Sequence, residues 1–372
     1  MVIDLLKKLI SIPSFVDEKN NEKIIAGFII DFFKNDLPWF KIKKQQITNN
    51  RFNLIASDGY KPQLIFLCHL DTVKPSADIK TMLTPKIKRQ KIYGLGACDM
   101  KGGIASLLIA LKEKNKTKGI MIIFDCDEEY YFLGIKKILE KYSFNPSLIV
   151  CPEPTDLEIV NGCRGIAEIE LEVLGKTAHA ASPNLGINAI EQSVNLISLL
   201  KKKLNLKKNN FLGNNTVNLA YLNGGKFSNG VIATQANAVA DIANLLLDIR
   251  ISQTNLNGKK IVEIIKKISQ SLKLKINKTE INIDYQSYWT NPKEIKTFEK
   301  QLMKNKLEIK YKKLETMGFF EGALVAKKWN CPTISFGPSG SKSAHTRDEY
   351  VEINSLFKVK NVFKELISAY SI

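Results

Sequence analysis

The three histidines of this 372-residue chain lie where an imidazole could bind a metal ion or stabilise a developing charge. His69 directly follows the strand-like apolar run Leu-Ile-Phe-Leu-Cys, and His345 follows a similar run and a Gly-Pro-Ser-Gly turn. His179 lies in the segment Gly-Lys-Thr-Ala-His-Ala-Ala-Ser-Pro. Because no histidine remains for the ordinary surface, this scarce residue marks the chemistry of the chain.

Five acidic residues occupy strand ends or the turn that opens a helix. One lies two residues after His69, and another lies in Gly-Leu-Gly-Ala-Cys-Asp-Met-Lys-Gly-Gly. Two adjacent ones follow the apolar run 121–126, and the last follows the run 148–151. Open α/β sheets build their sites at the carboxyl ends of strands, so these groups together with His69 and His345 predict a metal centre. The five are Asp71, Asp99, Glu128, Glu129 and Glu153.

These residues lie in five motifs that keep the order and approximate spacing of a known family. The motifs are Cys-His-Leu-Asp-Thr-Val, Gly-Ala-Cys-Asp-Met-Lys-Gly-Gly, Asp-Glu-Glu, Glu-Pro-Thr and Ala-His-Thr-Arg-Asp-Glu-Tyr. The chain thereby resembles, from about Asp4 to Leu356, the co-catalytic zinc family of aminoacylases, deacylases and carboxypeptidases. Succinyl-diaminopimelate desuccinylase and acetylornithine deacetylase belong to that family.

The resemblance implies a site for two Zn²⁺ ions, with Co²⁺ or Mn²⁺ as substitutes. His69 and Glu153 would bind one ion, Glu129 and His345 the other, and Asp99 would bridge them. Each ion then has three protein ligands and an open position for water, which is typical of a catalytic zinc site.

The resemblance also implies roles for residues around the metals. Asp71 is expected to accept the second ring N–H of His69 and so fix its tautomer. Glu128 is expected to be the general base that takes a proton from water and delivers it to the leaving amine. His179 is expected to reach from a partner subunit and stabilise the oxyanion, which makes a homodimer and a closing motion part of catalysis.

The same resemblance suggests how a substrate would be bound. Arg164 and Arg250 resemble binders of a substrate carboxylate, for which an arginine fork is suited, although either one could instead form a structural ion pair. Asn237 would be a further polar contact. The segment Thr-Met-Gly-Phe-Phe-Glu at 316–321 departs from the Gly-Thr-Ser-Asp type of several deacylases, and its two phenylalanines predict a more apolar pocket.

The leading hypothesis is an amidohydrolase that removes an acyl group from an N-acyl amino acid with a free carboxylate. Succinyl-diaminopimelate and acetylornithine-like substrates, from lysine and arginine biosynthesis, come first. A carrier-protein-lysine or -ornithine hydrolase and a dipeptidase or carboxypeptidase are alternatives within the family. A non-catalytic binding relative is a different class, which the intact set of ligands and Glu128 argues against.

The hydrophobic pattern predicts an α/β fold with an inserted second domain. Alternating helices (3–11, 20–35, 102–114) and strands (63–68, 119–125, 147–151) indicate a mostly parallel sheet covered on both faces. From 165 the order changes to strand 166–174, helix 186–204, strands 216–222 and 238–251, helix 258–273 and strand 275–285. This βαββαβ unit, residues 165–285, is expected to be an α+β domain inserted into the catalytic domain, residues 1–164 and 286–372, and the family resemblance implies that it is a lid and dimerisation domain. Helices 293–305 and 320–328 and strand 332–336 complete the latter.

Composition narrows the remaining function classes. The net charge of +18 comes almost entirely from lysine on helical segments, without aromatic residues between for base stacking, so we expect no nucleic-acid partner. The six cysteines form no Cys-x-x-Cys pair and indicate a reducing compartment. No apolar run reaches the ~18–20 residues of a membrane span, and the first residues do not read as a signal peptide. We therefore expect a cytoplasmic enzyme that acts on small molecules.

Overall fold

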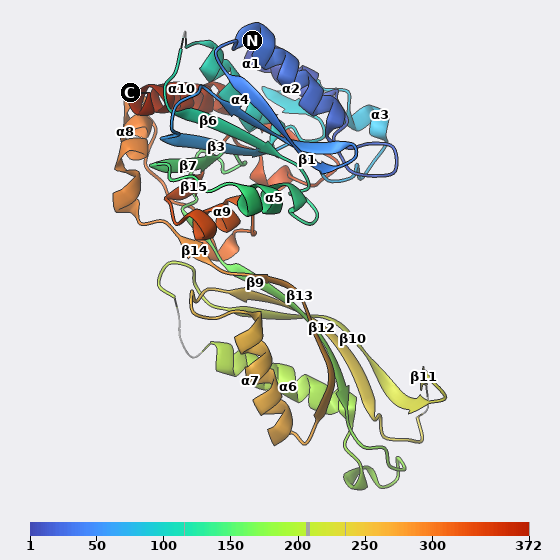
Figure 1. Cartoon of the computed structure of the whole chain (residues 1–372). Helices are drawn as coiled ribbons and strands as arrows, with labels where there is room; N and C mark the ends of the chain where they lie inside the picture. The colour runs from blue at the N-terminus through green and yellow to red at the C-terminus, as the bar shows by residue number, and fades with distance from the viewer. Residues whose placement is uncertain (115, 206–208, 235, 372) are drawn as a thin grey trace. The chain divides into compact units, whose positions relative to one another are not determined.

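The structure is a computed structural model that describes residues 1–114, 116–205, 209–234 and 236–371. It divides into two compact units (Figure 1). The first unit contains Met1–Asn161, Thr290–Lys312 and Phe320–Ile372, and the second contains Gly162–Trp289 and Lys313–Phe319. The second unit is therefore built from the inserted segment, with residues 313–319 added to it.

A six-stranded sheet forms the centre of the first unit, in the order β1-β2-β6-β3-β7-β15. The pairings β6–β3, β3–β7 and β7–β15 are parallel, whereas β1–β2 and β2–β6 are antiparallel. The predicted parallel sheet thus has an antiparallel hairpin added at one edge. The strands are β1 (Lys41–Thr48), β2 (Arg51–Ser57), β3 (Leu64–His69), β6 (Ile120–Asp125), β7 (Leu148–Cys151) and β15 (Thr333–Ser335).

Helices cover both faces of this sheet, as Figure 1 shows. On one face α4 (Lys101–Lys112) packs between α1 (Val2–Ile10) and α10 (Ile353–Tyr370), with α2 (Lys23–Asp36) beside them. On the other face α5 (Leu133–Lys141) contacts α9 (Glu321–Trp329). The α4 helix is buried along nearly its whole length because it lies between other helices and the sheet.

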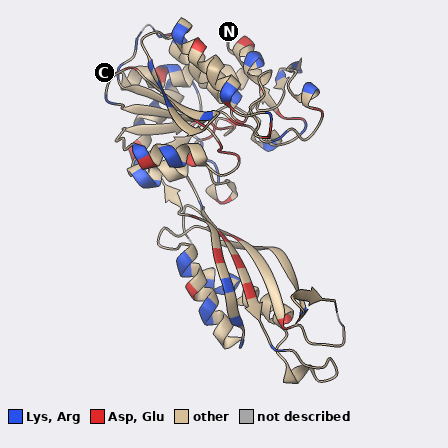
Figure 2. Ribbon diagram, turned by 45° about the vertical axis from the view of Figure 1, so that its right-hand side comes forward, with Lys and Arg blue, Asp and Glu red and all other residues tan. Residues whose placement is uncertain are grey.

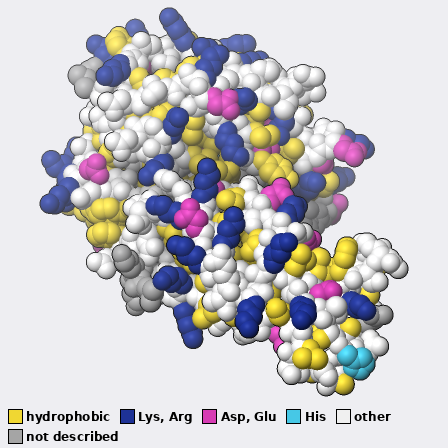
Figure 3. Space-filling view, turned by 60° about the horizontal axis from the view of Figure 1, so that its bottom comes forward, with side chains coloured by type: hydrophobic (Ala, Val, Ile, Leu, Met, Phe, Trp, Pro, Cys, Tyr) yellow, Lys and Arg dark blue, Asp and Glu magenta, His cyan; other side chains and the backbone are white. Residues whose placement is uncertain are grey.

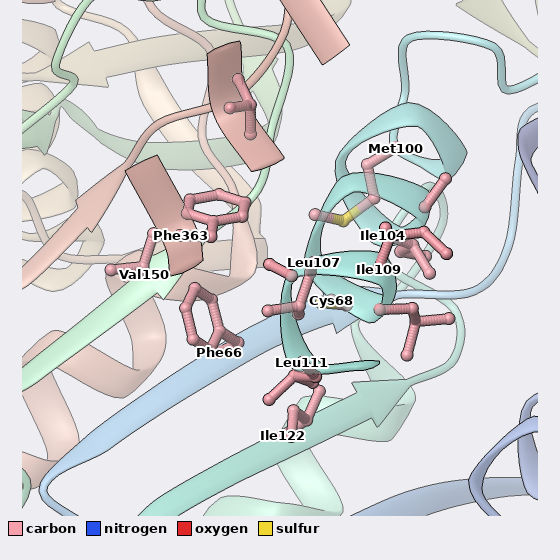
Figure 4. Close-up of a cluster of buried hydrophobic side chains, with 14 of the residues drawn as sticks. Phe66, Cys68, Met100, Ile104, Leu107, Ile109, Leu111, Ile122, Val150 and Phe363 are labelled. Carbon is pink, nitrogen blue, oxygen red and sulfur yellow. The ribbon is translucent and has the colours of Figure 1, made fainter. Parts of the chain in front are cut away.

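The core between α4, α10 and the sheet is aliphatic and aromatic (Figure 4). Phe66 of β3 meets Phe363 of α10 edge to face, with ring centroids 5.1 Å apart. Leu107 and Leu111 of α4 lie close to these rings. This packing fixes the strands whose carboxyl ends carry the predicted ligands.

Short elements complete the first unit. A small antiparallel sheet has the order β16-β5-β4, formed by Tyr350–Glu352, Lys91–Tyr93 and Lys86–Lys88. The helix α8 (Lys296–Lys304) packs on α10. The remaining elements are α3 (Ile79–Met82) and the 3-10 turns η2 (Pro292–Ile295) and η4 (Ser341–Ser343).

The second unit is a five-stranded antiparallel sheet with two helices on one face. The strand order is β11-β10-β12-β9-β13, and β9 alternates buried and half-buried residues along its whole length, as a one-sided sheet requires. Asn188 and Asn257 cap the amino ends of α6 and α7. The elements are β9 (Gly165–Leu174), α6 (Ala189–Leu204), β10 (Thr216–Ser228), β11 (Val231–Ala233), β12 (Ile242–Ile251), α7 (Gly258–Ser271), β13 (Lys275–Tyr285), the pair β8 (Gly162–Cys163) and β14 (Tyr288–Trp289), and the turns η1 (Pro183–Leu185) and η3 (Leu314–Thr316).

Residues of opposite charge are distributed differently over the described helices and strands. Figure 2 shows Lys and Arg mainly on helices, whereas Asp and Glu lie along strands of the second unit's sheet, among them Glu168, Glu170 and Glu172 of β9. Figure 3 shows the blue side chains scattered among uncharged atoms. All six cysteines are free and buried. None of the helices in the described ranges is long and apolar enough to cross a membrane.

Candidate metal centre and active site

The topology of the first sheet brings the predicted metal ligands together. His69 is the last residue of β3, and Glu129 and Glu153 follow the neighbouring parallel strands β6 and β7. Parallel strands end at the same edge of a sheet, so residues far apart in the sequence meet there. Asp99 enters from the turn before α4, and His345 from the turn after η4.

Two groups of donors share Asp99. The Nε2 atom of His69 lies 3.2 Å from Oδ1 of Asp99 and 3.8 Å from Oε1 of Glu153. The Nε2 atom of His345 lies 3.3 Å from Oδ2 of Asp99 and 3.0 Å from Oε1 of Glu129. Each oxygen of Asp99 therefore faces a different imidazole, which is the arrangement that a bridging carboxylate needs.

The chemistry of this donor set fits cations. Within each of the groups His69–Asp99–Glu153 and Asp99–Glu129–His345, one ligand atom from each residue lies within 4.8 Å of the others. Oε1 of Glu153 is buried and has no hydrogen-bond partner among the described residues. Burial also raises the pKa of the Glu153 carboxyl well above its ordinary value. A bound cation would supply the missing partner and offset the cost of burying these carboxylates.

The histidines respond to the same excess of carboxylates. Hydrogen bonds from His345 to Asp99 and Glu129 raise its pKa to about 11. Burial opposes the charged form of His69, but the hydrogen bond to Asp99 and the charge of Glu153 outweigh it and raise the pKa of His69. Metal ligation requires neutral imidazole, so a metal ion competes with protons here.

Two glycines pack closely against the backbone of the segment that carries Glu153. A Cβ atom on Gly103 would lie 2.0 Å from the carbonyl oxygen of Pro152, and one on Gly337 would lie 2.2 Å from the carbonyl oxygen of Glu153. Only glycine fits at either position. The Lys-Gly-Gly motif at the start of α4 therefore ends in glycine because α4 packs directly against the backbone of Pro152.

Asp71 has a different contact from the one expected. The backbone carbonyl oxygen of Asp71, not its carboxylate, lies 3.0 Å from Nδ1 of His69, while Oδ1 of the carboxylate is 3.8 Å away. The carboxylate instead accepts hydrogen bonds from the backbone N–H groups of Glu128 (3.1 Å) and Glu129 (3.0 Å). Asp71 can still fix the tautomer of His69, but through its main chain, because its side chain is turned to the adjacent loop.

Glu128 lies beside the predicted ligands. One of its oxygens groups with donors of His69 and Glu129 within 4.8 Å. Burial, together with the negative charge of Glu321, raises the pKa of Glu128 well above its ordinary value of 4.5. A carboxyl group next to a metal centre is placed to accept a proton from water and to return it.

His179 and Asn237 come together in the second unit. His179 forms an isolated antiparallel bridge with Ala238, and the N–H of Ala180 donates to the carbonyl oxygen of Asn237 (3.0 Å). Both predicted residues are exposed. Nδ1 of His179 accepts from the backbone N–H of Ala181 at 3.1 Å, so Nε2 is the ring nitrogen that this contact does not use.

The two arginines of the second unit differ in their contacts. Arg250 forms a bidentate ion pair with Asp248, at 2.8 and 3.0 Å. Arg164 donates from Nη1 to the carbonyl oxygen of Asn214 (3.2 Å), but its Nε is buried and lacks a hydrogen-bond partner in the described part of the chain. Burial, and then the charge of Arg250, lower the pKa of Arg164. The negative charges of Glu315 and Asp248 also act on Arg164, but neither forms an ion pair with it within 4.0 Å among the residues that the structure describes.

Several functional neighbours escaped the sequence analysis. Arg51 binds Glu22 and Asp127 at 2.6 and 2.7 Å and so braces the loop that carries Glu128 and Glu129. The feature of the sequence that could have pointed to Arg51 is the scarcity of arginine in this chain. Asp125 and Glu321 are fully buried beneath the site, and both of their carboxyl groups lack hydrogen-bond partners in the described residues. No pattern in the sequence around these two residues indicates that they are buried.

An α/β sheet that gathers imidazoles and carboxylates around a shared aspartate at its carboxyl edge defines a metal-dependent hydrolase. The particular family follows from the sequence. The chain belongs to peptidase family M20/M25/M40, whose sequence model matches residues 65–369. It is therefore a hydrolase that acts on amide bonds.

Known proteins resemble the chain over its whole length. An acetylornithine deacetylase of Buchnera aphidicola is 29% identical, with 99% of this chain and 97% of the relative covered. Among solved structures, the aminopeptidase PepT of Bacillus cereus has a TM-score of 0.76 at 20% identity, covering 100% of this chain and 98% of the other. Sso-CP2, an M20 family metallo-carboxypeptidase of Sulfolobus solfataricus, has a TM-score of 0.73 at 18% identity. The match covers 100% of this chain and 99% of the other. These structures confirm the predicted fold class.

Proposed function

We propose that the protein is a dinuclear zinc amidohydrolase that removes the acyl group from an N-acyl amino acid with a free carboxylate. The observation that carries the proposal is the position of Asp99 between His69 and His345. Among the candidate substrates, N-acetylornithine comes first, because full-length relatives at 26–29% identity are named acetylornithine deacetylase.

The metal ligands would divide as the sequence resemblance implies. His69 and Glu153 would hold one zinc ion, Glu129 and His345 the other, with Asp99 shared. When bound, the two ions supply Lewis-acid polarisation of the amide carbonyl and of the attacking water.

Glu128 carries out the proton transfers in this proposal. Its carboxylate takes a proton from the attacking water and later delivers it to the amine that leaves. The position of Glu128 supports this role, since one of its oxygens groups with donor atoms of His69 and Glu129 within 4.8 Å. Asp71 supports it by holding the backbone of the Glu128–Glu129 segment.

The second unit would bind the amino acid part of the substrate. Arg164 and Arg250 bind its carboxylate, Asn237 adds a polar contact, and His179 from a partner subunit stabilises the oxyanion. The unpartnered Nε of Arg164 supports an anionic ligand. For Arg250 the ion pair with Asp248 would have to be shared with that ligand or exchanged for it.

Apolar and aromatic side chains lie in the same row of the second sheet as Arg250. Ile166 pairs with Arg250 on one side and with Tyr285 on the other, and the ring of Phe319 stacks on Tyr285 at 5.0 Å between centroids. Directly opposed residues in a sheet point to the same face. This aromatic pair favours a substrate with an apolar acyl or side-chain group and keeps a dipeptidase or carboxypeptidase activity as the second candidate.

The test is release of amine from N-acetylornithine, N-succinyl-diaminopimelate and a set of dipeptides, measured side by side with zinc. The variant Glu128→Gln serves as the blank because it keeps the shape of the residue and removes the proton acceptor. Turnover that is lost with a chelator and in the variant supports the proposal and names the substrate. Wild-type turnover retained by Glu128→Gln would refute the role of Glu128, and absence of turnover with two zinc ions bound would refute the substrate class.

A further inference from the structure

Glu349 is buried directly after an exposed segment. It is 2% exposed, whereas the preceding residues 345–348 are all exposed. No lysine, arginine or histidine lies within 4.0 Å of its carboxylate among the described residues. A carboxylate that is buried without a cation needs strong hydrogen-bond donors, and these donors show what it does.

The donors all come from the segment that carries Asp99. The backbone N–H of Gly96 donates to Oε2 at 2.9 Å. The N–H groups of Cys98 and Asp99 donate to Oε1 at 3.0 and 3.2 Å. A single side chain therefore fixes the backbone of the turn from which Asp99 projects.

The same residue also anchors the segment that carries His345. The carbonyl oxygen of Glu349 accepts from the N–H of Gly94 (3.1 Å), and the next residue, Tyr350, pairs with Tyr93 in the small sheet. His345 itself is 52% exposed and has a positive φ of 61°, so its own packing does not hold it in place. Its position depends on where the loop is tied down.

We propose that Glu349 is a positioning residue that holds Asp99 and His345 in register. Asp99 can serve two metal ions only if one oxygen faces His69 while the other faces His345. Glu349 links the Asp99 turn to the His345 loop, so its loss would weaken metal binding without removing a ligand. This inference rests on the proposed metal site but not on the substrate or on turnover.

The variant Glu349→Gln tests the proposal. Both carboxylate oxygens accept hydrogen bonds, so an amide group must place its own N–H₂ against a backbone N–H whichever way it turns. We expect the affinity for at least one of two zinc ions to fall about 10- to 100-fold, measured by chelator competition and calorimetry on metal-free protein titrated with zinc alone. In turnover assays kcat should fall while KM changes little.

A matched control separates positioning from general stability. Asp58 is also buried and accepts the backbone N–H groups of Gly119 (3.2 Å) and Ile120 (2.9 Å), but at the opposite end of β6. Asp58→Asn should lower the melting temperature and leave zinc affinity unchanged. Zinc affinity in Glu349→Gln equal to that of the wild type, or an equal loss in Asp58→Asn, would overturn the proposal.

A measurement on the wild type keeps the proposal testable if the variant does not fold. In metal-free protein the amides of Gly96, Cys98 and Asp99 should be protected from hydrogen exchange, because Glu349 holds them without any metal. Exchange of these amides at the rate of an unprotected chain, with the β3 amides still protected, would contradict the proposal. Failure of the amide-hydrolysis assay would leave both readouts intact, so the two proposals fail independently.

Discussion

The carboxylate of Asp71 accepts a hydrogen bond from the backbone N–H of Glu129 at 3.0 Å, so a residue next to one predicted ligand holds the main chain of another. The same carboxylate accepts from Glu128 at 3.1 Å. Asp71 is 1% exposed, and its burial raises its pKa to about 7. The loop after β6 is thus positioned from β3, the neighbouring strand.

Replacement of Asp71 by Asn should therefore impair catalysis more than substrate binding. Asn keeps the size of the side chain but places an N–H₂ group against one of the two backbone donors. We expect kcat to fall about 10- to 100-fold, as for other residues that orient ligands, with KM nearly unchanged. Steady-state kinetics on the substrate found in the amine-release assay would measure this. A rise of KM at constant kcat would instead indicate a substrate contact.

The sequence could predict the site because its motifs lie at strand ends. His69, Glu129 and Glu153 follow β3, β6 and β7, and a parallel sheet must bring those ends together. It could not predict which atoms of Asp71 face His69, since a carboxylate and a backbone carbonyl of one residue are equally near in sequence. The contacts of Glu349 also escaped, because they are made with the main chain of a segment about 250 residues away.

The fold was predictable where periodicity is strong. The predicted helix 258–273 and strand 275–285 correspond to α7 and β13. The hairpin β1–β2 was missed because β1 is mostly exposed and polar, so its residues lack a clear alternating pattern. The final helix α10 and the helix α5 were also missed, although α10 buries much of the first core.

Arg51 should contribute strongly to stability. It is the shared partner of Glu22 and Asp127, which are 1% and 2% exposed. Arg51→Ala would leave two buried carboxylates without their cation, which typically costs about 3–5 kcal/mol. Urea denaturation would measure the change in the free energy of unfolding. The double replacement of Glu22 by Gln and Arg51 by Met should recover part of it, and a loss below about 1 kcal/mol in Arg51→Ala would show that the network matters little.

Metal removal should destabilise the first unit. An ion present at 100 times its dissociation constant adds about 2.7 kcal/mol to the free energy of unfolding. Two ions at that level add about 5 kcal/mol and should raise the melting temperature by roughly 10–20 °C, given about 2–4 °C per kcal/mol for domains near this size. Calorimetry of metal-free protein with and without zinc would measure the shift. Asp99→Asn should abolish most of it, and a wild-type melting temperature independent of zinc would argue against the metal site.

Glu113 should make stability depend on pH in the acidic range. It accepts hydrogen bonds from Lys360 and Lys364 of α10, both at 2.7 Å. Burial opposes the charge of Glu113, but the two lysines outweigh it and lower its pKa below the ordinary value of 4.5. A carboxyl group whose pKa is lower in the folded state stabilises the fold above its unfolded pKa, and that contribution is lost as the pH falls through its folded pKa.

Glu113→Gln should therefore be less stable than the wild type by about 1 kcal/mol at pH 7, and the difference should shrink as the pH falls through the lowered pKa of Glu113. Urea denaturation at several pH values would show this. Glu140→Gln, which breaks the exposed pair with Lys137, is the matched control and should have almost no effect at any pH. A stability difference for Glu113→Gln that persists at low pH would mean that packing, not charge, is responsible.

Phe319 should set the preference among acyl amino acids. Its ring stacks on Tyr285, which lies in one row with Ile166 and Arg250 across the second sheet. Phe319→Thr removes the aromatic ring that stacks on Tyr285 and leaves Arg250 unchanged. We expect kcat/KM for substrates with an apolar acyl or side-chain group to fall about 10-fold or more, with little change for short polar ones, since one apolar contact typically discriminates by 10- to 200-fold.

The control is Phe211, which stacks on Trp289 at 4.0 Å and is 56% exposed. Phe211→Ser removes a similar ring from the same unit, from a strand-free segment before β10, and should lower kcat/KM equally for all substrates or not at all. A ratio of apolar to polar kcat/KM that is unchanged in Phe319→Thr would show that the aromatic pair only packs. A ratio that falls in Phe319→Thr alone would support a role of the aromatic pair in substrate preference.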